Sequence, residues 1–244
     1  MSGLRRALLL VGSPRRARST SASLGGYLLD RLANHGVTGC AHFLEDLPPA
    51  AAYDVGAGSE PAPASNRAVP AIGPALAIGD ADLLILAFPL YVDAPPAPVI
   101  RAMVAMAEAR RRERATDGAP GFVAIVNCGF PEAHHADVAL AISGRFAAVC
   151  RFRWLGGMAM GLGGMLGGRP LGEGDARLAH LEQGLELAAA ALARDEAVPE
   201  LARELLARPV VTPARFVAMG NRNWSDKAAA RGLQDRLREQ PYRR

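Results

Sequence analysis

The sequence has few of the residues that mark metal-binding and disulfide-bonded proteins. Its 244 residues include three cysteines, Cys40, Cys128 and Cys150, which lie far apart and form no CxxC pair or Cys/His finger. This spacing argues against a structural zinc site and against a cysteine-ligated iron–sulfur cluster, so we expect no metal. An odd number of cysteines without a signal peptide predicts a reducing, cytoplasmic location.

Long hydrophobic runs and lysine are also scarce. The longest apolar stretch, around Leu155 to Leu166, is broken by glycines and is too short to span a bilayer, so we expect no membrane partner. Lys227 is the single lysine among 28 basic residues, and the net charge is +4. A nucleic-acid binder concentrates positive charge in a stripe. The arginine excess here accompanies an Ala- and Gly-rich composition, so we expect no nucleic-acid partner either.

The sequence does contain apolar runs that alternate with amphipathic segments. We expect four strands, over residues 7–12, 37–44, 82–89 and 121–129, and a fifth that starts at 152–155 and leads into a glycine-rich connection. We expect helices over residues 19–33, 98–114, 132–149, 176–194, 200–207 and 225–238. Residues 48–74 should form a long loop and residues 210–219 an extended segment. This alternation predicts an α/β fold with a parallel sheet that is covered on both faces.

Three polar loops follow strands of this predicted sheet: Ser13 to Ser21, Pro89 to Ala94, and Asn127 to Glu132. In parallel sheets, ligands bind beyond the carboxyl ends of the strands, near the point where the strand order reverses. We therefore expect one site that is built from all three loops.

The first loop, "GSPRRARST", has the residues of an anion site. It lacks the GxxxxGK[ST] and GxGxxG patterns of the common nucleotide-binding loops. Backbone N–H groups at the start of the following helix nevertheless favour an anion, and the hydroxyls of Ser13, Ser19, Thr20 and Ser21 can donate hydrogen bonds to phosphate oxygens. An ordinary helix cap, at Ser19 or Thr20, with solvated arginines is the alternative.

The other two loops offer apolar and polar surfaces. In "FPLYVDAPP", proline and tyrosine after the third strand could stack on a flat ring, or form only a turn. In "NCGFPEAHH", Gly129 permits a close approach of the backbone, and the amides before the helix could bind a polar ring edge. His134 and His135 should diverge by about 100° on a helix, so we expect surface residues and no shared metal.

Together, "GSPRRARST", "FPLYVDAPPAP" and "NCGFPEAHH" resemble the NADPH-dependent FMN reductase family of the flavodoxin-like superfamily. The resemblance covers roughly residues 4–195. It implies a three-layer sandwich with a five-stranded parallel sheet in the order 2-1-3-4-5 and helices on both faces. We expect this domain to span residues 1–198, followed by a helical extension over residues 199–244 that packs on the domain or on a partner subunit.

The resemblance implies FMN, bound without covalent attachment. The phosphate would be surrounded by Ser13, Arg15, Ser19, Thr20 and Ser21. The isoalloxazine would lie along Pro89, Leu90, Tyr91 and Val92, and its polar edge or face would meet Asn127, Cys128, Gly129 and Phe130. Arg18 departs from the family pattern, because relatives often have a small residue there.

The activity implied is an NAD(P)H-dependent oxidoreductase. Hydride would pass from nicotinamide C4 of NADPH or NADH to flavin N5, and then to a quinone-like, flavin or other small-molecule acceptor. Because the flavin supplies this chemistry, no catalytic acid or base is expected, while Tyr91 and Phe130 would shape the acceptor site. Two alternatives are a flavin-binding electron carrier or regulatory protein without NAD(P)H turnover, and a structural module without flavin. A homodimer is also expected.

The C-terminal tail is too apolar at Phe216, Val217 and Trp224 for a free arm. We expect Asn223 or Ser225 to cap its last helix, whose Leu233 and Leu237 share one face. That helix either covers an edge of the sheet or places Trp224 and the turn at residues 220–221 beside the acceptor pocket.

Overall fold

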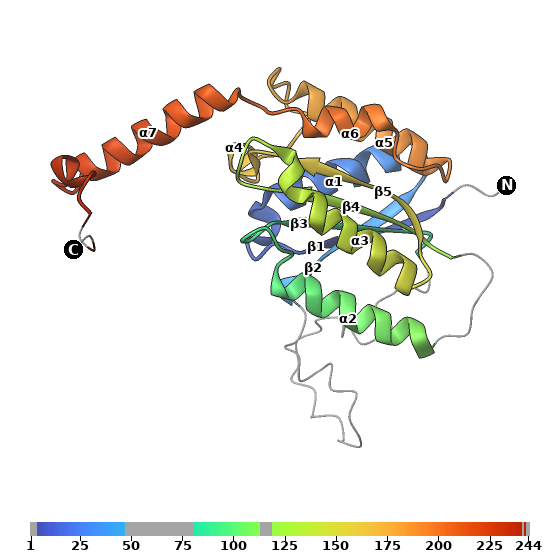
Figure 1. The fold of residues 1–244 in the computed structure, drawn as a ribbon. Coiled ribbons are helices and arrows are strands. Elements are labelled where there is room, and N and C mark those ends of the chain that lie inside the picture. Colours follow the sequence, from blue (N-terminus) through green and yellow to red (C-terminus); the bar gives the residue numbers. More distant parts are fainter. Residues whose placement is uncertain (1–3, 47–80, 113–118, 241, 243–244) are drawn as a thin grey trace, which may run out of the picture.

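The structure, a computed structural model, describes residues 4–46, 81–112, 119–240 and 242. The long loop predicted for residues 48–74 lies outside the described residues. Figure 1 shows three layers, with a central sheet between two groups of helices, and a further helix that projects away from them.

The sheet has five strands, all parallel, in the order β2-β1-β3-β4-β5. Their bounds are Arg6–Val11 for β1, Thr38–Phe43 for β2, Leu83–Pro89 for β3, Gly121–Asn127 for β4 and Arg153–Met160 for β5. Every residue of β3 and β4 is buried, as expected for central strands covered on both faces. The order and the direction of the strands confirm the predicted topology.

Two groups of helices cover the sheet (Figure 1). One apolar cluster joins one face of the sheet to α1 (Thr20–Ala33), α5 (Ala179–Ala193) and α6 (Glu200–Ala207). A second cluster joins the other face to α2 (Ala97–Arg112) and α3 (Asp137–Val149). The 3₁₀ turn η5 (Ala133–Ala136) precedes α3, where the sequence predicted one continuous helix from residue 132.

The strand register brings the predicted loops to one edge of the sheet. Val11 of β1 pairs with Ala87 of β3, and Pro89 of β3 pairs with Asn127 of β4. The Gly12 N–H donates to the carbonyl of Ala87 at 2.8 Å. The three central strands therefore end at nearly the same level, as the sequence predicted for the site.

The fifth strand is longer than expected, because it continues to Met160 through residues predicted to form the glycine-rich connection. Gly156 has a φ of +120°, and the register against β4 shifts at this point, which is a β-bulge. A Cβ on Gly157 would lie 2.5 Å from the side chain of Leu140, so the missing side chain lets α3 lie close to the strand. Gly156 and Gly157 therefore belong to a strand and permit its close packing, whereas the sequence had predicted a loop here.

The C-terminal helix also differs from the prediction. Residues 213–219, predicted as extended, belong to α7 (Pro213–Ala229), and the helix predicted for 225–238 ends at Ala229. Thr212 is the N-cap, with proline at the first helical position, and the expected cap Ser225 lies inside the helix. The Thr-Pro pair is a helix start signal, and it outweighed the extended preference that the sequence analysis gave to Val210 and Val211.

Candidate functional site

The loop after β1 folds into a tight turn that places three arginines at the carboxyl edge of the sheet. The 3₁₀ turn η1 (Arg16–Arg18) is closed by hydrogen bonds from the Arg16 N–H to the Ser13 carbonyl and from the Arg18 N–H to the Arg15 carbonyl. Arg15, Arg16 and Arg18 are all exposed. The Arg15 guanidinium donates to the carbonyl of Gly167 at 3.4 Å, so it lies beside the start of α1 and the loop after β5.

The start of α1 follows directly, and its hydroxyl groups point inward. Ser19 is the N-cap, as predicted, because its hydroxyl accepts from the Ala22 N–H and donates to the Arg16 carbonyl. Thr20 donates to the carbonyl of Gly163 at 2.5 Å, and Ser21 donates to the side-chain oxygen of Asn127 at 2.8 Å.

Because the hydroxyls of Ser19, Thr20 and Ser21 donate to acceptors inside the protein, other groups are the candidate donors to a bound anion. The N–H groups of Thr20 and Ser21 open a 14-residue helix, and such groups lack intrahelical acceptors. The positive end of the helix dipole lies there as well. The amides and the Arg15 guanidinium are thus candidate donors, together with the Ser13 hydroxyl, which accepts from the Arg15 N–H. Direct phosphate contacts from the hydroxyls of Ser13, Ser19, Thr20 and Ser21 stay predictions.

The loop after β3 forms a strained hairpin. Tyr91 and Ala94 exchange two backbone hydrogen bonds, of 3.0 and 3.2 Å. Both central residues, Val92 and Asp93, have positive φ values, 52° and 57°. That conformation is costly for a β-branched residue, and such strain concentrates at functional sites. The Val92 side chain is 99 % exposed, so a large apolar group is held at the edge of the sheet with nothing over it in the described residues.

The loop after β4 lies against this hairpin. The Leu90 N–H donates to the Asn127 carbonyl at 2.8 Å, and His135 Nδ1 lies 3.8 Å from Asp93 Oδ1. The Phe130 ring is exposed and packs on the imidazole of His135, with ring centroids 5.2 Å apart. His134 and His135 were predicted to diverge, but their rings stack with centroids 4.8 Å apart, on a 3₁₀ turn. Successive residues of a 3₁₀ turn point about 120° apart, so the stacking comes from the side-chain torsions and not from the turn.

Cys128 points into the protein. Its thiol lies 3.5 Å from the carbonyl oxygens of Phe130 and Glu132 and can donate to them. Burial raises the pKa of the Cys128 thiol, so the group stays protonated and is poorly nucleophilic. The Cys128 backbone is also hydrogen-bonded, because its N–H donates to the Met160 carbonyl at 3.0 Å and its carbonyl accepts from the Gly163 N–H at 2.8 Å. A contact of Cys128 with a ring edge stays a prediction. Gly129 beside it has open space where a Cβ would stand.

A fourth segment, residues 161–168 after β5, completes the site and contains the one-turn helix α4 (Gly163–Leu166). The sequence did not predict that this 161–168 loop would belong to the site. Gly163 donates to the Cys128 carbonyl at 2.8 Å and accepts from Thr20, so it joins β4 to α1. A Cβ on Gly163 would lie 2.6 Å from the Asn127 amide, and one on Gly168 2.3 Å from the Arg18 carbonyl. The dense glycines of this loop were the available signal, since close backbone contact requires them.

The arrangement suits a ligand with an anionic group joined to a flat apolar one. The helix start and Arg15 provide the anion end. The exposed side chains of Tyr91, Val92 and Phe130 provide an apolar surface on the neighbouring loops. A phosphate ester that carries an aromatic ring system fits this pair of features.

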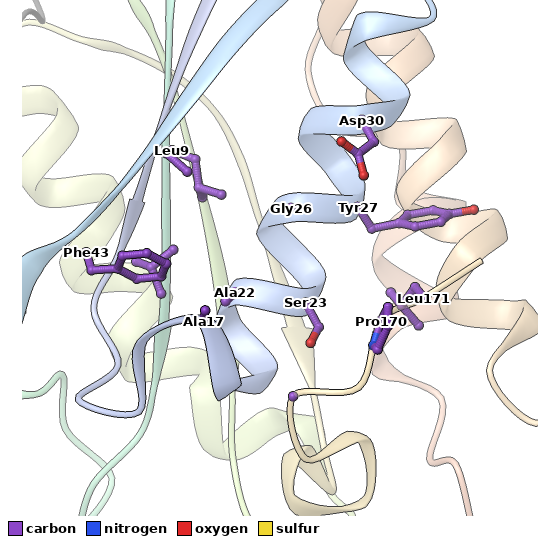
Figure 2. A pocket seen from close by; sticks show the side chains of 13 residues that line it. Leu9, Ala17, Ala22, Ser23, Gly26, Tyr27, Asp30, Phe43, Pro170 and Leu171 are labelled. Atoms are coloured by element: carbon purple, nitrogen blue, oxygen red, sulfur yellow. The ribbon is translucent and has the colours of Figure 1, made fainter. Parts of the chain in front are cut away.

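A hollow of about 380 Å³ lies between α1 and strands β1 and β2, and Ala17 of the first loop and Gly168 belong to its lining (Figure 2). Leu9 and Phe43 form its strand side, and Tyr27 and Asp30 line it from α1. Asp30 is the one charged residue of its lining, and a carboxylate repels anions. The hollow is therefore not the anion site.

The described residues hold no group of three or more His, Cys, Asp or Glu side chains that could bind a metal ion. None of the helices in the described ranges is long and apolar enough to cross a membrane.

The order 2-1-3-4-5 of an all-parallel sheet, with helices on both faces, is one of the two common doubly wound topologies. The chain has a flavodoxin-like fold. No protein-family model and no curated protein sequence matches the chain, so the likeness is found in solved structures alone.

Two solved structures share this flavodoxin-like architecture over most of their length. An NADH:FMN oxidoreductase in its apo form has a TM-score of 0.54 and 18% identity, over 82% of this chain and 94% of that chain. A putative quinone reductase from Klebsiella pneumoniae has a TM-score of 0.50 and 16% identity, over 80% and 87%. At these identities the likeness concerns the fold.

Proposed function

We propose that this chain is an FMN-binding, NAD(P)H-dependent oxidoreductase of the NADPH-dependent FMN reductase family. The observation that carries the proposal is the anion cradle at the start of α1, directly beside the exposed Tyr91, Val92 and Phe130. These features lie at the switch point of a flavodoxin-like sheet, where such folds bind mononucleotides. The two solved structures, described as an NADH:FMN oxidoreductase and a putative quinone reductase, support the same class of activity.

In this proposal the protein binds and orients, and FMN supplies the redox chemistry when bound. The amides of Thr20 and Ser21 and the guanidinium of Arg15 would hold the phosphate. The hairpin at Tyr91 and Val92 and the loop at Gly129 and Phe130 would hold the ring system. Because these loops are joined by short hydrogen bonds, the two ends of the site are fixed relative to each other.

An open ring site also suits exchange of small molecules. The Tyr91 and Phe130 side chains are 46 % and 56 % exposed, so solvent reaches the edge where a nicotinamide or an acceptor would stack. We infer that NADPH or NADH is the electron donor, and that a quinone-like, flavin or other small molecule is the acceptor. A cytoplasmic homodimer belongs to the same proposal.

The experiment is a steady-state assay of the FMN-loaded protein with NADPH and with NADH. Oxygen, a soluble quinone and free FMN would be offered in turn as acceptors. We expect NAD(P)H oxidation that depends on added acceptor and saturates with it. A protein that binds FMN but does not oxidise either nicotinamide would be an electron carrier or a regulatory flavoprotein. A protein that does not bind FMN would contradict the whole proposal.

A further inference from the structure

The helix α7 forms an arm that leaves the body of the molecule (Figure 1). Its base is fixed, because His180 Nε2 lies 3.1 Å from the Arg208 carbonyl and Val210 packs on the α1–α5–α6 cluster. The chain then enters α7 at its cap, Thr212. Within α7, Ala228 is buried and Phe216 and Gly220 are partly buried, while the other 14 of its 17 residues are exposed.

One side of this arm is apolar. Phe216, Gly220, Trp224 and Ala228 recur every four residues, and Val217 lies beside them, which gives a stripe about 100° wide or more. Lys227 falls within the same arc, so this stripe carries one positive charge near its end. The opposite side carries Arg215, Arg222 and Ser225. Trp224 is 66 % exposed, and Leu233 and Leu237 extend the apolar surface around a hollow at the end of the arm. A helix with such a stripe normally lies on a core, and within the described residues this one does not.

The central residues of the arm also have a low intrinsic helix propensity, so the isolated helix would have little stability. Gly220, Asn221, Asn223, Ser225 and Asp226 are all poor helix formers in its centre. Isolated helices of this length are marginal in water even with favourable sequences, and most helix stability in proteins comes from packing of an apolar face. The arm therefore needs a surface to cover.

The charges indicate where that surface lies. Residues 208–244 carry nine basic and three acidic residues, a net charge of +6, whereas residues 1–207 have a net charge of −2. Acidic residues concentrate in the segment of α5 and α6, where residues 171–207 carry eight acidic and three basic residues. Five of these carboxylates pair with arginines of the same chain, and Glu204 is not among them. On α6, the exposed Leu201 and Glu204 lie on one side of the helix and offer an apolar and a negative group together.

We propose that α7 of one copy docks through its Phe216–Trp224 stripe on the α5–α6 surface of a second copy, and that the exchange of two arms forms a closed dimer. A twofold exchange uses each arm once and leaves none unpaired. Pairing of two arms with each other would bring two charges of +6 together, so the acidic body of the second copy is the better partner. This inference does not depend on the redox activity.

Sedimentation velocity of the full-length protein, from low to high micromolar concentration, tests the proposal with a matched pair of variants. Phe216→Ser together with Trp224→Ser removes the stripe, and Ala218→Ser changes the opposite side of the same helix. We expect a dimer for the wild type and for Ala218→Ser. Large aromatic residues dominate interfaces, so the double variant should raise the dimer dissociation constant about tenfold or more. At a concentration low enough for both proteins to be monomeric, its thermal unfolding midpoint should equal that of the wild type, and its FMN affinity should stay unchanged.

A monomeric wild-type protein would overturn the proposal, and if that monomer bound heparin, the arm would be a polyanion-binding element instead. A double variant that remains as dimeric as the wild type would overturn it as well, because another surface would then form the dimer.

Fluorescence gives an independent measurement in the same assembly. Trp154 and Trp224 are the two tryptophans of the chain, so Trp154→Phe leaves Trp224 as the single reporter. We expect blue-shifted emission at high micromolar concentration, when the arm is docked, and a red shift on dilution. Emission typical of water-exposed tryptophan at every concentration would contradict docking.

Discussion

The anion cradle predicts that Arg15→Ala weakens the binding of FMN much more than the binding of riboflavin, which has the same ring system and no phosphate. Arg15 is exposed, and the one hydrogen bond of its guanidinium within the described residues, to the Gly167 carbonyl, is long at 3.4 Å. Its removal should therefore have little effect on folding. The guanidinium is the charged donor at the anion end of the site, next to the amides that open α1.

The magnitude follows from the type of contact. A hydrogen bond to a charged group contributes about 1.5–3 kcal/mol. One tenfold change in affinity corresponds to about 1.4 kcal/mol, so the FMN dissociation constant should rise about tenfold to 150-fold. The riboflavin dissociation constant should change by less than about threefold, because no ring contact is lost.

The assay is a titration of each flavin with protein, followed by the quenching of flavin fluorescence, for the wild type and two variants. Arg145→Ala is the control, because Arg145 is an exposed arginine on α3 and the net charge changes equally. Urea unfolding of each variant checks that the fold is retained. Unchanged FMN affinity in Arg15→Ala, or an equal loss in Arg145→Ala, would refute the cradle assignment.

Three further predictions concern the scaffold of the site. Ser19→Ala removes the cap of α1 and should lower the free energy of unfolding, measured by urea titration, by about 1 kcal/mol. An unchanged free energy would mean that Ser19 does not stabilise the helix as a cap. Gly168→Ala should cost about 2 kcal/mol or more, because its Cβ would lie 2.3 Å from the Arg18 carbonyl at a φ of +83°, while Gly164→Ala, which meets nothing within 4 Å, should be nearly neutral. Burial and the hydrogen bond that the Tyr27 hydroxyl donates to the Glu186 carboxylate raise the pKa of Tyr27 to about 12, so its stabilising effect is present below pH 10 and is lost between pH 10 and 12. Spectrophotometric titration should show one late-titrating phenol that is absent from Tyr27→Phe.

The core and the order of the elements could be predicted from the sequence because their signals are local and strong. The apolar runs that became β3 and β4 are too short for a helix and are followed by turn residues, which favours a strand that is buried on both sides. The Ser19 cap could be predicted because it depends on residues within one helical turn. The meeting of three loops at one edge followed from the topology, since parallel strands all end on the same side.

The remaining features depend on contacts that are distant in the sequence. The inward direction of Thr20 and Ser21 depends on acceptors at Gly163 and Asn127, more than a hundred residues away. The role of the 161–168 loop arises in the same way, from the close approach of its backbone to Arg18 and Asn127. A glycine that permits such an approach looks the same in the sequence as a glycine in a mobile loop. The bulge at Gly156 in β5 could not be predicted for the same reason, because its glycines look like those of a loop in the sequence.

The central claim, that this flavodoxin-like chain binds FMN and accepts electrons from NAD(P)H, is tested most directly by an absorbance spectrum of the purified protein. The spectrum would be recorded after incubation with FMN and removal of free flavin, and again after anaerobic addition of NADPH or NADH. We predict the two visible bands of a bound oxidised flavin, in about one equivalent per chain, and their bleaching by one of the nicotinamides. A colourless protein after gel filtration, or bound flavin that neither nicotinamide bleaches, would contradict the account.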